Sequence, residues 1–398
     1  MKRVNGATTQ HFRSPQIICR IAGIVAIGIF FAAGCTDDSP SSASKPGLSD
    51  QQLEAAMRQR IEVECASASE SPWLIAHGMI ALGAGAELFG PNRERGVDRL
   101  AREWIKRDAE GAYVDRNGPD GRLGEQHAHL VYKTLAELSL APELRAELKR
   151  RAVTRFRLPQ DPHSWDDAAW LLEALARDPE VRADSPLGEH AVPAATLARG
   201  LLEIVESADR VVEEALKQDA GYFVRPTSES PESSGIYYYT CGGQHALQAL
   251  LVASGRDWFT VDERERVGRR LDVFLRRVDA EDQFRAREYQ AAVERGTSTM
   301  QARRFATLFQ LKLLGHALAT FARASQAGLR ETELKRVVPR LRTRVFELFR
   351  ILETELDPRR ELWAKLRDRE KSHWELWFGD SCHALDGLNL TQSFDGRK

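Results

Sequence analysis

Several features that would assign a function are missing from this 398-residue sequence. Its 57 Lys and Arg residues balance 58 Asp and Glu residues, and the formal net charge of −1 gives no electrostatic reason to expect a nucleic-acid partner. No P-loop, HExxH, Gly-x-Ser-x-Gly or EF-hand pattern is present, so the usual sequence signatures of those sites are lacking. Val, Ile, Thr and Tyr do not form alternating runs, which argues against a β-sheet.

The amino-terminal segment has no acidic residue before Asp37. Its basic residues are followed by an uninterrupted apolar stretch at residues 21–34, which is short for a membrane-spanning helix but typical of a signal peptide. Residues 32–35 (Ala-Ala-Gly-Cys) resemble the processing box of bacterial lipoproteins. The resemblance implies cleavage before Cys35, a lipid on its thiol, and a mature protein anchored to a membrane of the cell envelope. An uncleaved anchor and an ordinary secretory peptide are the alternatives.

The rest of the chain is divided by composition. Residues 35–50 are rich in Ser, Pro and Asp, cannot bury much apolar surface, and predict a flexible tether behind the lipidated Cys35. Residues 51–398 predict a single domain, long enough to bury about three quarters of its unfolded surface. Apart from the anchor, the mature chain has only Cys65, Cys241 and Cys382, and this odd number leaves at least one thiol outside any disulfide.

The domain is predicted to be all-α, because apolar residues recur with helical spacing almost throughout. Amphipathic, charged helices alternate with helices that are apolar on most faces, which indicates an outer and an inner set. The charged helices are expected at residues 51–66, 91–108, 142–157, 192–218, 261–279 and 331–355. The apolar helices are expected at residues 72–88, 123–140, 164–176, 241–254, 300–327 and from residue 381.

This alternation resembles the (α/α)6 toroid, in which parallel inner helices are wrapped by outer ones. An open solenoid of α-hairpins and an irregular helical bundle are the alternative architectures. Long connections are expected before several inner helices, at residues 109–122, 219–240, 280–299 and 356–380. In a toroid these connections and the starts of the inner helices would share one rim, where a pocket is expected.

Residues that could carry chemistry gather near the predicted starts of inner helices. Cys241 and His245 are spaced i, i+4 and would share one helical face, while Cys382 and His383 are adjacent. A thiolate and neutral imidazoles are zinc ligands, so these four residues are the candidate metal site. The candidate catalytic residues are His77, His127, Asp166 and Asp167. His127, His129 and His316 also fit hydrogen-bonded core histidines, and the two aspartates fit partners of a helix dipole after a Ser164 cap.

Two toroid families resemble parts of this set. Asp380-Ser-Cys382 is similar to the zinc-binding Asp-x-Cys of protein prenyltransferases, relatives in fold of the terpenoid cyclases. Cys241 and the later pair Cys382-His383 resemble the zinc-holding Cys and Cys-His pair of lanthionine synthetase C-like proteins, which also have a His-Gly on an early helix, as at His77-Gly78. Either resemblance implies a toroid with a zinc ion at its mouth.

The function stays open between three classes. The first is an enzyme that uses zinc held by Cys241, Cys382 and His383, with a further histidine as ligand or base. The second is a metal-free, glycan-processing enzyme that uses paired carboxylates. Its candidates are Asp120, Glu125, Asp166, Asp167, Glu375 and Asp380, supported by Tyr239 and His127. The third is a non-catalytic scaffold that binds a protein or peptide. The substrate, whether small molecule, glycan or peptide, is not specified by the sequence.

Overall fold

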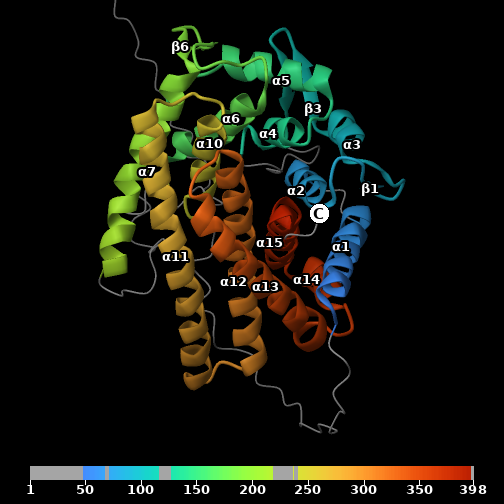
Figure 1. Ribbon diagram of the computed structural model, residues 1–398. Helices are drawn as coiled ribbons and strands as arrows, with labels where there is room; N and C mark the ends of the chain where they lie inside the picture. Colours follow the sequence, from blue (N-terminus) through green and yellow to red (C-terminus); the bar gives the residue numbers. More distant parts are fainter. Residues whose placement is uncertain (1–47, 68–70, 116–126, 218–235, 237–240, 396–398) are drawn as a thin grey trace, which may run out of the picture.

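The computed structural model of the protein describes residues 48–67, 71–115, 127–217, 236 and 241–395. Most residues in these ranges lie in α-helices, which confirms the predicted all-α class (Figure 1). The predicted signal peptide, Cys35 and most of the predicted tether lie outside the described residues.

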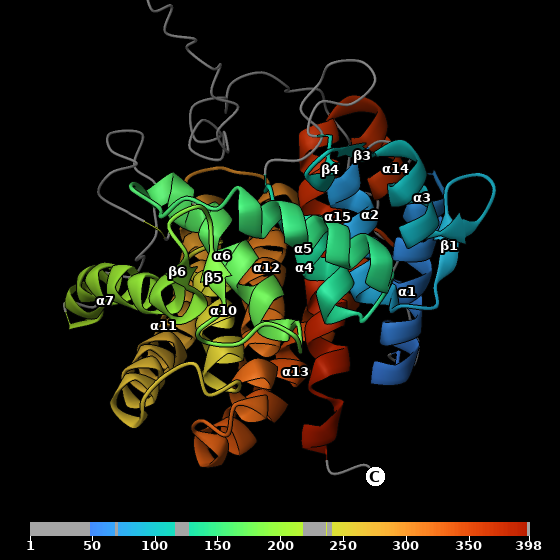
Figure 2. The ribbon, with the colours of Figure 1, turned by 90° about the horizontal axis from the view of Figure 1, so that it is seen from above.

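Apolar helices form the interior of the domain. They are α2 (Pro72–Leu82), α4 (Leu130–Glu137), α6 (Pro162–Arg177), α10 (Gln244–Ser254), α12 (Thr299–Gln326) and α15 (Lys371–Leu390). Each packs against the next one in this order, and α15 also packs against α2 (Figures 1 and 2). Because each lies between two such neighbours, most of its faces are buried, and this explains why its sequence is apolar nearly all round.

Charged helices cover this interior. They are α1 (Asp50–Ser67), α3 (Gly96–Glu103), α5 (Pro142–Thr154), α7 (Ala194–Lys217), α11 (Val261–Glu294) and α13 (Glu331–Ile351). α5 shows the pattern: it buries Leu144, Leu148 and Ala152, at four-residue spacing, and exposes charged residues elsewhere. A π-helical turn (Leu352–Leu356), α14 (Leu362–Arg369) and a 3-10 turn (Gln392–Asp395) complete the described helical elements.

The backbones of α12 and α15 approach each other closely. A Cβ atom at Gly315 would lie 2.6 Å from the backbone nitrogen of Ala384, and one at Gly387 would lie 2.6 Å from the carbonyl oxygen of Gly315. Only glycine fits such a contact. The contact places His316, which follows Gly315, beside His383, which precedes Ala384. Among the described helices α12 is long and apolar enough to cross a bilayer, but most of it is buried inside the protein.

The expectation that the chain has no sheet was wrong in detail. In the described part of the chain, three two-stranded antiparallel hairpins connect the helices: β1 (Glu87–Phe89) with β2 (Glu94–Arg95), β3 (Ile105–Asp108) with β4 (Gly111–Val114), and β5 (Pro186–Leu187) with β6 (Val192–Pro193). Strands this short contain too few residues to show an alternating pattern. Two of these strand pairs flank α3 and shorten the charged helix predicted at residues 91–108.

Two of the predicted long connections are mostly helical. α11 continues to Glu294 and α12 begins at Thr299, so little of the loop predicted at residues 280–299 remains. α14 and the first half of α15 occupy most of residues 356–380. These stretches are rich in charge, which hides the helical period that their few buried residues would otherwise show. Two of the four long connections expected at the rim are therefore largely helical. The connection predicted at residues 219–240 lies almost entirely outside the described residues.

Candidate metal centre and polar interior

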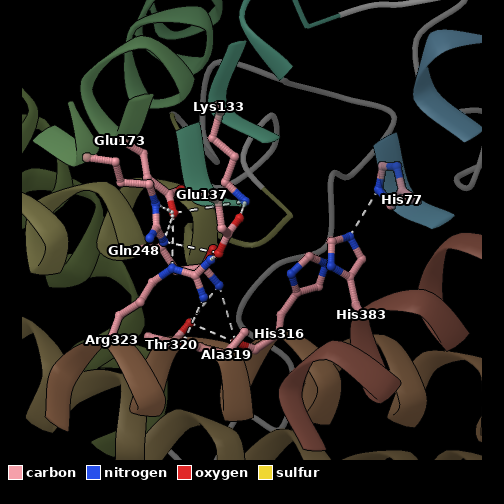
Figure 3. A network of polar contacts seen from close by, with 11 residues as sticks. His77, Lys133, Glu137, Glu173, Gln248, His316, Ala319, Thr320, Arg323 and His383 are labelled. Carbon is pink, nitrogen blue, oxygen red and sulfur yellow. Dashed lines mark hydrogen bonds and ion pairs between the residues drawn. The ribbon is translucent and has the colours of Figure 1, made fainter. Parts of the chain in front are cut away.

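Four buried histidines from four inner helices meet inside the protein. They are His77 of α2, His245 of α10, His316 of α12 and His383 of α15. The ring centroids of His316 and His383 are 3.7 Å apart, and those of His245 and His316 are 4.8 Å apart. His77 meets His383 edge to face, with ring centroids 4.8 Å apart (Figure 3). Residues separated by up to 306 positions are thus brought into one imidazole cluster.

Hydrogen bonds fix the proton positions of two of these rings. His77 Nδ1 lies 2.7 Å from the carbonyl oxygen of Trp73, and because a carbonyl only accepts, this nitrogen carries the proton. Burial lowers the pKa of His77 to about 3, so the ring is neutral and its Nε2 must accept. Nε2 of His383, 3.1 Å away, is therefore the donor, and His383 keeps its lone pair on Nδ1. This chain from a backbone carbonyl through two imidazoles orients His383.

Cys241, His245 and His316 form a candidate metal site. One ligand atom from each lies within 4.8 Å of the others. Around zinc, ligand atoms about 2.0–2.3 Å from the ion are about 3.3–3.8 Å apart, so the side chains need to close by only about 1 Å. Both ring nitrogens of His316 and Nδ1 of His245 are buried, with no hydrogen-bond partner in the part of the chain that the structure describes. Burial lowers the pKa of both rings well below the usual value, which keeps them in the neutral form that binds metals.

Cys241 reaches this site from a turn. Cys241, Gly242 and Gly243 have φ angles of 50°, 76° and 82°, so they cannot continue a helix, and α10 begins at Gln244. The prediction that Cys241 lies on the same helix as His245 was therefore wrong, although the two residues do come together. The turn is held by Arg277 of α11, whose guanidinium donates to the carbonyl oxygen of Gly242.

Cys382 lies outside this group. It precedes His383 on α15, and neighbouring positions on a helix point about 100° apart, so the two side chains face different surroundings. Cys382 is buried, and burial together with nearby Cys65 of α1 raises the pKa of its thiol well above the usual value. Both Cys65 and Cys382 are free thiols, so Cys382 forms no disulfide with Cys241 in this structure.

His127 and Asp166, two of the candidate catalytic residues, are brought together by the structure. His127 Nδ1, just before α4, lies 3.1 Å from Oδ2 of buried Asp166 on α6. The Nε1 of Trp170 donates to the other carboxylate oxygen at 3.3 Å, and the indole stacks between His127 and His245, with centroid distances of 4.9 and 4.2 Å. Trp170 thus links this pair to the candidate metal site.

Asp167 has a different environment from Asp166. Its Oδ1 accepts a hydrogen bond of 3.2 Å from the backbone nitrogen of Ala128 and so holds the segment that carries His127. The predicted cap of this helix was also wrong by three residues. Asp161 is the N-cap of α6, and its side chain accepts from the backbone nitrogen of Ser164 while Ser164 Oγ accepts from that of Asp161.

A buried charged network, missed in the sequence, lies beside the imidazole cluster. It consists of Lys133, Glu137, Glu173 and Arg323 (Figure 3), together with Arg177. Lys133 Nζ lies 2.5 Å from Glu137 Oε2, and Arg323 Nε lies 3.0 Å from Glu173 Oε1. Burial alone would raise the pKa of Glu137. The positive charges of Arg177, Arg323 and Lys133 outweigh this effect, hold the pKa well below its usual range, and keep the carboxyl ionised.

The charged network and the cluster share helix faces. Arg323 follows His316 by seven positions, which is two helical turns, and Glu173 follows Asp166 by the same spacing. Gln248 lies between the imidazole cluster and the charged network, where its Nε2 donates to Thr320 Oγ1 at 3.0 Å (Figure 3). Polar residues repeating at seven-residue spacing on otherwise apolar helices are the sequence signal that would have revealed this polar interior.

The carboxylates predicted for a glycan-processing site are only partly described. Asp380 of α15 is buried, and burial raises its pKa to about 7 although Lys312 acts against this. Glu375 is half-buried on the same helix. Asp120, Glu125 and Tyr239 lie outside the described residues.

No family model, curated protein or solved structure matches the chain, so its chemistry has to be argued from its own geometry.

Proposed function

We propose that this protein is a lipid-anchored enzyme of the bacterial cell envelope, built as an (α/α)6 toroid around a zinc site. The toroid is supported by the order of the helix contacts, which run from α2 through α4, α6, α10 and α12 to α15 and return to α2. An open solenoid would lack the contact between its first and last inner helices. The envelope location is supported by the lipoprotein-like sequence that ends at Cys35.

The zinc proposal is carried by one observation, the convergence of Cys241, His245 and His316 within 4.8 Å. These residues come from one turn and two inner helices, and the imidazole nitrogens of His316 and Nδ1 of His245 have no other partner among the described residues. Buried polar atoms are nearly always satisfied, so unused nitrogens beside a thiol favour a bound cation. One thiolate and two neutral imidazoles are a typical zinc set, and three protein ligands leave a coordination position open.

The proposed reaction class is hydrolysis. Zinc with an open position supplies Lewis-acid activation of water or of a substrate carbonyl. The chain itself supplies a base: Asp166 accepts the Nδ1 proton of His127, which leaves Nε2 of His127 as the nitrogen that can take a proton. His127 is partly exposed, with 20% of its side chain accessible, so a substrate can reach it. Asp167 positions His127 through the backbone of Ala128.

Metal analysis of the full chain, purified in detergent without chelators and under reducing conditions, tests this proposal. We expect about one zinc per chain, and a thiolate-to-metal charge-transfer band after replacement by cobalt. Cys241→Ser and His316→Ala should each remove the metal. Cys241→Ser should also remove the charge-transfer band, because it removes the thiolate. Cys382→Ser is the matched control, because Cys382 is also a buried thiol next to a cluster histidine but lies outside the ligand group. Wild-type protein without stoichiometric metal, or loss of metal from the control alone, would refute the site.

A metal-free, glycan-processing enzyme is the second candidate, favoured by the environment of Asp380. This carboxyl, buried with a pKa of about 7, is protonated in part at neutral pH, as a general acid must be, and Asp166 would be the second carboxylate. Degradation of envelope glycans that persists with chelator and in Cys241→Ser, but is lost in Asp380→Asn, would favour this candidate over the zinc enzyme.

A further inference from the structure

A cavity lies away from the imidazole cluster, between the β3–β4 hairpin and helices α4, α5 and α6. Its volume is about 370 Å³, within the range of small-molecule sites. The inner wall is apolar and is formed by Ala112, Leu148, Ala152, Phe156, Ala168 and Leu171. The wall therefore suits an aliphatic or aromatic body.

The cavity is built by a hairpin that is fixed to α5. Arg150 Nε donates to the carbonyl oxygen of Glu110 at 3.1 Å, and Arg155 pairs with the Glu110 carboxylate. At the hairpin turn, Gly111 has a φ of 132°, and a Cβ there would lie 2.7 Å from the carbonyl oxygen of Glu147. Glycine thus lets the hairpin rest on α5, and the ion pairs hold it there. The hairpin and α5 therefore form two walls of the cavity that are fixed relative to each other.

The lining of the cavity carries more positive than negative charge. Arg151, Arg155 and Arg157 contribute to it, against one carboxylate, Asp167. Arg151 lies over the ring of Tyr113 at 4.3 Å and is paired with Asp108. Arg157 is exposed and, unlike the other two arginines, makes no ion pair or hydrogen bond with the described residues. A guanidinium in this state is available to a carboxylate, which it binds with two parallel hydrogen bonds.

We propose that this cavity binds a small organic carboxylate with an apolar body, with the body against the apolar wall and the carboxylate at Arg157. The site is distinct from the candidate metal centre, and its ligand would bind with or without zinc. The two sites nevertheless share one segment. Asp167 and Ala128 line the cavity, while the adjacent Asp166 and His127 form the interior pair.

Calorimetric titration of the full chain with 4-phenylbutyrate, a water-soluble carboxylate with an aromatic body, tests the proposal. We expect saturable binding that chelator does not change. The neutral analogue 4-phenylbutanol should bind at least about tenfold more weakly, because a hydrogen bond to a charged group contributes about 1.5–3 kcal/mol. Acetate, which has the charge without the body, should not bind measurably.

Two variants locate the ligand. Arg157→Gln should weaken 4-phenylbutyrate binding about tenfold or more, for the same reason. Arg336→Gln is the matched control, since Arg336 is an exposed arginine of α13 that also lacks a partner among the described residues, and it should bind as wild type does. Ala152→Leu should fill the cavity and abolish binding. Absence of saturable binding to the wild type, or wild-type affinity in Arg157→Gln, would overturn the proposal, even if Ala152→Leu failed to fold.

Discussion

Removal of the Arg323 guanidinium should destabilise the protein strongly. Arg323 is 3% exposed and is held by the carboxylates of Glu137 and Glu173 and by the carbonyl oxygen of Ala319. In Arg323→Met the apolar stem is kept, but the two buried carboxylates retain only Lys133 and Arg177 as partners. Lys133 and Arg177 still balance the two carboxylates in charge, but the carboxylates lose charge-assisted hydrogen bonds that water cannot replace. Removing one partner of a buried ion pair costs up to about 3–5 kcal/mol. This is a large part of the about 5–15 kcal/mol that usually stabilises a folded domain.

Equilibrium urea unfolding, followed by circular dichroism at pH 7, measures this effect. Arg336→Met serves as the control, because it removes an exposed arginine without partners among the described residues and should change the free energy of unfolding by less than about 0.5 kcal/mol. In the double variant Arg323→Met/Glu173→Gln the two losses should not add, because both substitutions remove the same ion pair. A loss below about 1 kcal/mol in Arg323→Met, or additive losses in the double variant, would refute the view that the ion pair between Arg323 and the buried carboxylates stabilises the fold.

Two further predictions concern pH and location. Asp209 of α7 is buried, burial raises its pKa to about 7 despite its hydrogen bond of 2.9 Å with Arg270, and its ordinary value is 3.8. The stability that Asp209 contributes is therefore fully present below pH 3.8 and is lost as the pH rises towards 7, at up to about 1.4 kcal/mol per pH unit. Asp209→Asn should become progressively more stable relative to wild type between pH 4.5 and 6.5 in urea unfolding, and a pH-independent difference would contradict this. Separately, Cys35→Ser should move the protein from the membrane fraction to the soluble fraction or leave it with an uncleaved leader, and unchanged membrane association with a processed leader would exclude lipidation of Cys35.

Local patterns in the sequence were sufficient to predict the helical class and part of the interior. A buried helix has to be apolar on nearly all faces, and this made α2, α6, α10 and α12 recognisable. Polar residues are rare on such helices, and this rarity made His77, Asp166 and His245 candidates for a functional site. His127 and Asp166 were named as separate candidates, and the structure brings them to within 3.1 Å of each other.

Contacts between distant residues were not predictable in this way. From the sequence, His316 fitted a hydrogen-bonded core histidine, whereas its ring nitrogens have no hydrogen bond within the described ranges, and His316 lies beside Cys241. Cys382 and His383 were grouped because they are adjacent, yet helical geometry points them apart. The charges of Lys133 and Glu137 are spaced i, i+4 and so resemble an exposed helical pair, and only tertiary packing shows that both are buried. The short hairpins fell below the length at which a strand pattern is visible.

The hydrogen bond between His77 and His383 has a consequence for how the protein is made. It joins the first inner helix to the last, so it cannot form until nearly the whole chain is present. Contacts between such distant residues slow folding, because the chain must lose the entropy of closing a very long loop. A chain that crosses a membrane unfolded, with its leader first, exports α15 last. The imidazole cluster then stays incomplete until α15 has crossed. The cluster would therefore form in the compartment where the protein is proposed to work.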